Sequence, residues 1–175
     1  MDLPEYLLSL QQAELGLADS YARVAGSPSG GHSDRTLFLA LANQGREHAN
    51  ALDALLERYG GPSGPMPGPA GTGPSPPDEG SRPTRFLQFQ DLYLSACLVD
   101  VGWTVLMQAG RGLEDRDFVR VIDHCSSETG KQLAWIKTRI KHAASPTLLR
   151  PQLHAGHRRP PGRTALATGR PGGGP

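Results

Sequence analysis

The side chains of this chain that could do chemistry in a protein interior are a few carboxylates and one imidazole set among apolar residues. Glu14, His48, Asp100 and Glu128 all fall on or beside positions where apolar residues recur every three or four residues. Carboxylates neutralise and bridge divalent cations, and imidazole adds a nitrogen donor. A set of this composition has the chemistry of a metal site or of a buried polar network, and helices must bring its members together.

Two helices are predicted in the first 59 residues. In the first, Glu14 occupies the middle of an apolar stripe with alternating spacings of four and three, so it is expected to point inward. The second is predicted to begin after Ser33 or Asp34, either of which can cap it, and to end at Tyr59 before Gly-Gly-Pro. His48 falls in its stripe and is also expected to face the core. The two stripes are Leu3, Leu7, Leu10, Glu14, Leu17, Tyr21, Val24 and Phe38, Leu41, Gly45, His48, Leu52, Leu55, Tyr59.

A third helix is predicted from about Arg85 to Ala109. Apolar residues surround most of its circumference, which is typical of a central helix or of one that also covers a subunit interface. One register of its buried stripe places Asp100 inward. That register is Phe86, Phe89, Tyr93, Ala96, Asp100, Trp103 and Met107.

The fourth helix is predicted to start near Glu114 or Asp115 and to end at about Ala144, because Ser145 precedes a proline. Two registers fit it, and the residues alone leave both open. Glu128 lies beside the buried stripe in one and on it in the other. The first register is Ile122, Cys125, Thr129, Leu133, Ile136 and Ile140; the second is Phe118, Val121, Cys125, Glu128, Gln132 and Trp135.

The connections predict the fold class. Residues 60–84 are rich in proline and glycine, which add backbone entropy and block helix continuation, so they are predicted to form an irregular crossover. Short links join the first helix to the second and the third to the fourth. Two hairpins tied by one long crossover predict an all-α, antiparallel four-helix bundle over residues 1–145. Residues 146–175 are predicted to form a disordered, basic tail rich in proline and glycine.

With Glu14 on the first predicted helix and Arg46-Glu47-His48-Ala49 on the second, residues 3–144 resemble the ferritin-like superfamily. In its metal-binding members, two helices each supply one inward Glu and the other two each supply Glu-x-x-His. The resemblance implies a di-iron or di-manganese site where the ligands are complete. Carried over by position, Glu14 matches the first-helix Glu and His48 the second-helix histidine. Glu128 and Asp100 offer carboxylates on the fourth and third helices.

Two positions depart from that pattern. Gly45 stands three residues before His48, where a carboxylate is expected, and Lys131 stands where the second histidine is expected. A protonated lysine repels a cation. The resemblance therefore implies a degenerate dinuclear site, in which too few carboxylates remain to neutralise two divalent ions.

These departures decide the expected function. We expect a non-enzymatic, ferritin-like scaffold or interaction protein without a cofactor, in which Lys131, His48 or Gln44 balances the buried carboxylates. The alternative is an iron- or manganese-dependent oxidoreductase or iron-handling protein. Its ligands would be Glu14, His48, Asp100 and Glu128.

Composition bears on location and partners. The chain has neither a basic and apolar leader nor a run of about 18 uninterrupted apolar residues, so we expect a cytoplasmic protein without a membrane span. Cys97 and Cys125 form no disulfide framework. The breadth of the third helix's apolar surface predicts a homodimer. Residues 146–175 hold five arginines and no acidic residue, which would suit an acidic or nucleic-acid partner.

Overall fold

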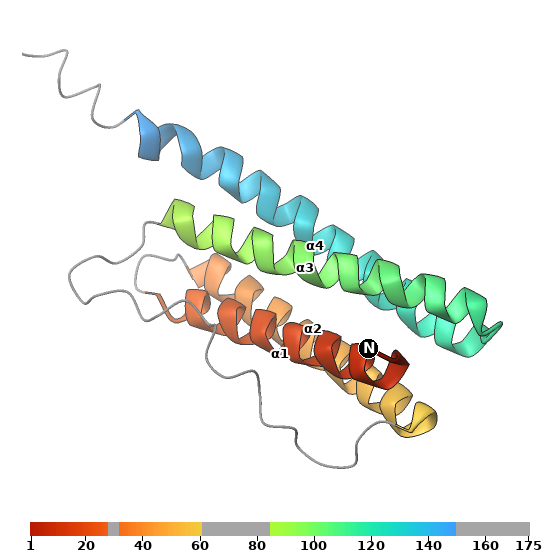
Figure 1. Cartoon of the computed structure of the whole chain (residues 1–175). Coiled ribbons are helices and arrows are strands. Elements are labelled where there is room, and N and C mark those ends of the chain that lie inside the picture. Colours follow the sequence, from red (N-terminus) through yellow and green to blue (C-terminus); the bar gives the residue numbers. More distant parts are fainter. Residues whose placement is uncertain (28–31, 61–84, 150–175) are drawn as a thin grey trace, which may run out of the picture.

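The computed structural model describes residues 1–27, 32–60 and 85–149, and these residues form four α-helices and no strand (Figure 1). The helices are α1 (Leu3–Ala25), α2 (His32–Tyr59), α3 (Arg85–Gly112) and α4 (Arg116–Leu148). The expected all-α class is confirmed. Most of the expected crossover (61–84) and of the expected tail (150–175) lies outside the described residues.

Local sequence explains where the helices begin and end. Asp2 caps α1 through a capping box with Glu5, and Asp115 caps α4 by accepting hydrogen bonds from the backbone of Asp117 and Phe118. Gly60 follows α2 with a φ of 77°, the left-handed conformation in which glycine ends a helix. The expected boundaries at these ends agree with the structure to within about two residues.

Two helix ends expected from glycine and proline are wrong. α3 continues past Ala109 through Gly112, and α4 continues past Ala144 to Leu148, so residues 146–148 belong to the bundle's last helix and not to a tail. Pro146 lies inside α4 and cannot donate the hydrogen bond that its nitrogen would otherwise make, yet the helix continues past it. The Leu149 backbone N–H donates to the Ser145 carbonyl at 3.1 Å, so the hydrogen-bond ladder resumes beyond the proline.

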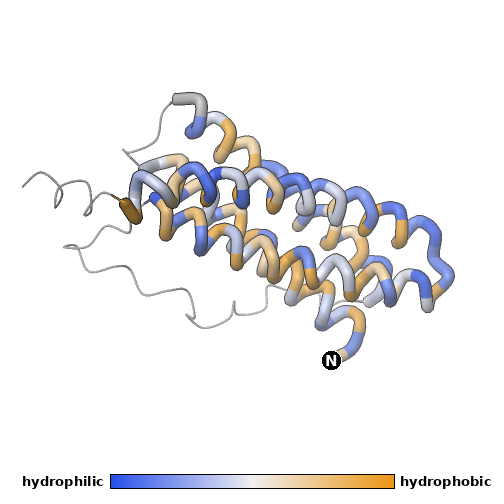
Figure 2. Tube along the Cα trace, turned by 90° about the horizontal axis from the view of Figure 1, so that it is seen from above, coloured by the Kyte–Doolittle hydropathy of each residue, from blue (hydrophilic) through white to orange (hydrophobic). Residues whose placement is uncertain are grey.

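The four helices share one apolar core. α1 packs mainly against α2 and also against α3, while α4 packs mainly against α3 and only lightly against α2. Figure 2 shows apolar and polar residues alternating along the helices, which is how one face of each helix can be buried. Besides Glu14, the largest fully buried side chains are Trp103, Tyr21, Phe38, Phe118, Leu7, Leu17, Leu52, Leu92, Leu106, Ile122 and Ile136.

Partly exposed ion pairs join the helices at both ends of the bundle. At one end, Asp34 of α2 binds Arg85 of α3 at 2.7 Å and Arg139 of α4 at 3.1 Å. At the other end, Asp115 binds Arg58 at 2.8 Å and accepts a hydrogen bond from the hydroxyl of Tyr59. Each carboxylate therefore joins helices that are distant in sequence, and together they fix how far the helices can slide.

α3 is apolar on two faces. One face is buried against α1 and α4, and the other exposes leucine and valine side chains to solvent. Of the described helices, only α3 is long and apolar enough to cross a membrane, with a mean hydropathy of 1.4 over a window of which 33% is buried in the bundle. Its buried face explains why a helix this apolar can belong to a bundle core.

Two helical glycines make a matched test of the packing between α3 and α4. A Cβ at Gly110 would lie 2.5 Å from Cδ1 of the fully buried Phe118, whereas a Cβ at the exposed Gly130 would meet nothing within 4 Å. We expect Gly110→Ala to lower the free energy of unfolding by about 1–3 kcal/mol through overpacking. Gly130→Ala is expected to raise it by about 0.5–1 kcal/mol. Urea denaturation measures both, and a Gly110→Ala variant as stable as Gly130→Ala would contradict the close approach.

Candidate functional site

The centre of the bundle holds an imidazole between two carboxylates. His48 Nδ1 lies 2.9 Å from Glu14 Oε1, and His48 Nε2 lies 2.9 Å from Glu128 Oε2. The side chains of His48 and Glu14 are 2% and 1% exposed, while that of Glu128 is 24% exposed. The ring of His48 therefore joins α1, α2 and α4. Glu14 and His48 point inward, as their positions on the predicted stripes of α1 and α2 require.

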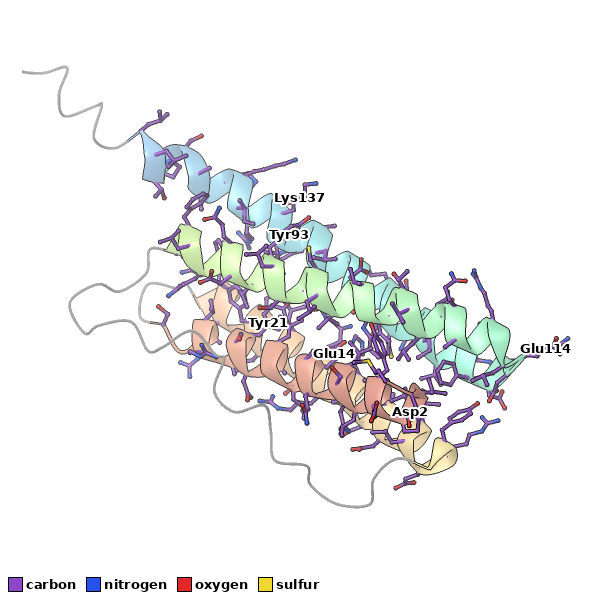
Figure 3. The ribbon with its side chains drawn as sticks, viewed as in Figure 1. Asp2, Glu14, Tyr21, Tyr93, Glu114 and Lys137 are labelled. Carbon is purple, nitrogen blue, oxygen red and sulfur yellow. The ribbon has the colours of Figure 1, made fainter. Side chains whose placement is uncertain are left out.

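The remaining helix, α3, joins this group through Trp103. Its indole N–H donates to Glu14 Oε1 at 2.9 Å, and its ring meets the His48 ring edge to face at a centroid distance of 5.8 Å. Trp103 itself is fully buried. Glu14, which lies on the side of α1 that faces the other helices in Figure 3, thus receives two hydrogen bonds on one oxygen. A buried carboxylate needs such partners, because desolvation of an unpaired charge is costly.

Both nitrogens of His48 face carboxylates, so the doubly protonated imidazolium fits the site best. Burial lowers the pKa of His48, but hydrogen bonds and charge from Glu14 and Glu128 raise it, and the net effect is a pKa above the ordinary 6.5. The hydrogen bond from His48 likewise lowers the pKa of Glu128 below 4.5, against the opposing effect of its own partial burial, with further help from Gln44 and His124. The site therefore holds an imidazolium between the side chains of Glu14 and Glu128.

A second set of polar side chains continues from this group across the bundle. The Tyr21 hydroxyl of α1 donates to Gln132 Oε1 of α4 at 2.9 Å, and Gln132 Nε2 donates to Gln44 Oε1 of α2 at 2.8 Å. Burial and the charge of Glu14 raise the pKa of Tyr21 well above its ordinary value, so the phenol stays a donor at neutral pH. These contacts fix the rotational setting of α4.

Gly45 shapes the contact between α1 and α2 beside the site. A Cβ at this position would lie 3.1 Å from Ala18 Cβ and 3.5 Å from Glu14 Oε2. The small residues Gly45 and Ala18 thus let the two helices approach closely where Glu14 and His48 meet. A larger side chain at position 45 would push against α1 and against the carboxylate of Glu14.

Two expected members of the site lie elsewhere. Asp100 was expected to face inward, but it is half-buried and lies beside the buried row of α3. The row keeps Ala96 and Trp103 of the expected register but passes through Val99 in place of Asp100. Among the described residues, no hydrogen bond or ion pair links the Asp100 side chain to Glu14, His48 or Glu128. Lys131 is exposed, so the positive charge inside the bundle comes from His48 and not from Lys131.

The buried residues of α4 draw on both predicted registers. Ile122, Thr129 and Ile136 belong to the first register, Phe118 and Gln132 belong to the second, and Cys125 belongs to both. Glu128 lies beside the buried row, as in the first register. Burial and the charges of Glu14 and Glu128 raise the pKa of the Cys125 thiol to about 12, so this cysteine stays protonated.

Sequence reasoning missed the roles of Trp103 and Gln132. Trp103 was placed in the core as an aromatic, but its indole N–H can only donate and must find an acceptor when it is buried. Glu14 was predicted to point inward and can accept this hydrogen bond. The predicted stripes that contain Glu14 and Trp103 therefore already indicated that the two side chains could pair. Gln132 carried no comparable signal, because its partners Tyr21 and Gln44 are distant in sequence.

The residues at the centre do not fit a dinuclear metal site. Two carboxylates and one imidazole converge, Gly45 beside them offers no side-chain ligand, and both imidazole nitrogens are already hydrogen-bonded. His124 Nε2 lies 3.7 Å from Glu128 Oε2, but its side chain is 72% exposed. In residues 1–27, 32–60 and 85–149, no group of three or more His, Cys, Asp or Glu side chains has an arrangement that would hold a metal ion.

Comparisons of the chain with protein-family models, with curated proteins and with solved structures find no match.

Proposed function

We propose that this chain is a non-enzymatic helical bundle that acts as a scaffold or interaction protein. The observation that carries the proposal is the position of His48, whose two nitrogens lie 2.9 Å from Glu14 and Glu128. A protonated imidazole has no lone pair for a metal, and its charge already balances the carboxylates. The polar centre of the bundle then serves to fix the helices against one another, which is the role that buried ion pairs fulfil best.

An antiparallel arrangement with ferritin-like connectivity is part of this proposal. Short links at residues 26–31 and 113–115 join α1 to α2 and α3 to α4, and the members of each pair pack side by side. Residues 60–84 are left to connect α2 with α3. One long and two short connections support this topology over an up-down-up-down bundle with three short loops.

The alternative is an iron- or manganese-dependent oxidoreductase or iron-handling protein. The meeting of Glu14, His48 and Glu128 at the centre of the bundle favours it, because these are three of the four residues that the resemblance assigned as ligands. Such a protein would have to deprotonate His48 and turn at least one of its nitrogens away from a carboxylate. The two proposals therefore differ in metal content and in the protonation of His48.

Metal analysis tests the proposal. Tag-free protein, purified without chelator and then loaded anaerobically with ferrous iron, should hold less than about 0.1 metal ion per chain by elemental mass spectrometry. Nitrogen NMR should show both ring nitrogens of His48 protonated at neutral pH. The matched control is Glu14→Gln, which should leave any residual metal unchanged. One or two ions per chain that are lost in Glu14→Gln would overturn the proposal.

A further inference from the structure

The outer face of α3 carries an apolar stripe that no other described element covers. Its five members lie between 44% and 67% exposed and follow one another along a single side of the helix, opposite the buried row. The stripe consists of Leu87, Leu94, Leu98, Val101 and Val105. From Leu94 to Val105 the spacings are four, three and four, which is the repeat of a helix that packs along another helix.

The positions beside the stripe indicate the chemistry of its partner. The flanking residues on this side of α3 are uncharged except for Asp91, so a charged partner would find a single group to pair with. The uncharged flanking residues are Gln90, Ser95, Cys97, Thr104, Gln108 and Ala109. A partner surface must therefore be apolar along the stripe and largely uncharged beside it. The same face of a second copy has both properties.

We infer that the outer face of α3 pairs with the same face of a second copy of this chain, with the two α3 helices running in opposite directions. This inference rests on the proposed function as an interaction protein. In this pairing Leu98 lies opposite Val101 of the other copy, and Leu94 lies opposite Val105. A two-fold axis between residues 99 and 100 relates the pairs, so one surface serves both copies.

Charge selects the antiparallel direction. Asp91 continues the stripe at one end and is exposed, and Gln108 continues it at the other. Antiparallel pairing places Asp91 opposite the neutral Gln108 of the second copy. Parallel pairing would place the Asp91 side chains of the two copies against each other, and like charges that face each other at an interface are destabilising.

A hollow beside the stripe supports the same pairing. It has a volume of about 240 Å³, lies between the start of α1 and the second half of α3, and is mostly apolar. Its lining is Met1, Asp2, Leu3, Tyr6, Val105, Leu106 and Ala109. Because Leu94 of the second copy lies opposite Val105, its side chain is the one placed to enter this hollow. A leucine filling an apolar hollow removes surface from water on both copies.

Charge substitutions on the stripe test the interface. The wild-type chain should approach the mass of a dimer by sedimentation equilibrium as its concentration rises to about 100 µM, and Val101→Lys should weaken the association at least about tenfold. The matched control is Leu39→Lys on α2, where the leucine is 43% exposed but lies off the stripe. It should leave the association unchanged. Circular dichroism should show all three proteins equally helical.

Cysteine crosslinking tests the direction, in a background with Cys97→Ser and Cys125→Ala. Antiparallel pairing predicts that a mixture of Leu94→Cys and Val105→Cys variants forms a crosslinked dimer, while Leu94→Cys alone does not. In that arrangement the two residues 94 are about 16 Å apart along the helix axis, too far for a disulfide. Crosslinking of Leu94→Cys alone would overturn the antiparallel direction.

The outcomes also separate this inference from the proposed function. A wild-type chain that stays monomeric at about 100 µM overturns the interface, and so does a monomer that binds phosphatidylcholine vesicles through α3. Either result leaves the metal-free centre standing. Stoichiometric metal in a chain that dimerises through α3 would instead overturn the proposed function and leave the interface intact.

Discussion

Replacing His48 with alanine is expected to lower the free energy of unfolding by about 3–5 kcal/mol, the usual effect of removing one partner of a buried ion pair. Glu14, which is 1% exposed, would keep only the hydrogen bond from Trp103 and would lose the imidazolium that accompanies its buried carboxyl group. Urea denaturation followed by circular dichroism measures the change. The matched control is His124→Ala, because His124 is 72% exposed and also lies beside Glu128. It should change stability by less than about 0.5 kcal/mol.

The same variant should lose part of the pH dependence of stability. Because the pKa of His48 is raised above 6.5 in the folded state, its contribution is complete below pH 6.5 and is lost as the pH rises through the folded pKa. Glu128 acts in the opposite sense, since its lowered pKa gives stability above pH 4.5 that is lost on acidification. Wild-type stability should thus be greatest between these values. His48→Ala should remove the decline above pH 6.5, and an unchanged decline would contradict the assignment.

A double substitution separates the charge from the cavity. Adding Glu14→Gln to His48→Ala removes the unpaired carboxylate that the single variant leaves behind. The double variant should therefore be more stable than the sum of the two single effects predicts, because residues in direct contact do not contribute independently. If the two effects simply add, His48 acts through its packing alone and the ion pair contributes nothing.

Replacing Trp103 with alanine is expected to lower the free energy of unfolding by about 3–5 kcal/mol. Trp103 is fully buried, and its loss removes both a large packed ring and the donor to Glu14. Thermal and urea denaturation measure the loss.

Trp103→Phe isolates the hydrogen bond. Phenylalanine retains an aromatic ring in the core but has no N–H, so the expected loss falls to about 1–3 kcal/mol, the range for leaving a buried polar group with one partner fewer. A phenylalanine variant as stable as the wild type would show that His48 alone satisfies Glu14. One as unstable as the alanine variant would show that the hydrogen bond outweighs the packing.

The sequence predicts the four helices and half of the central site. Glu14 and His48 interrupt stripes that are otherwise clearly apolar on one side, so their inward direction followed from helical periodicity alone, and burial confirms both. The all-α class followed from the same periodicity. These features are local, because each depends on the pattern within a single helix.

The rest of the site depends on contacts between helices. α3 has apolar residues on two faces, and periodicity alone does not say which face is buried, so the expected register placed Asp100 inward by error. In α4, Gln132 is buried because Tyr21 and Gln44 provide partners for its amide. The exposure of Lys131 follows from the same setting of α4. Residues this far apart in sequence give no local signal of their pairing.

The close approach at Gly45 has a consequence for the paths open to evolution. Introducing a carboxylate at this position by a single substitution would bring a side chain against Ala18 and against the carboxylate of Glu14. The change would become tolerable only after α1 had moved away or His48 had lost its place between two acids. A bundle with an imidazolium at its centre and a bundle with two metal ions are therefore separated by several mutually dependent substitutions, and intermediate sequences would fold less stably than either.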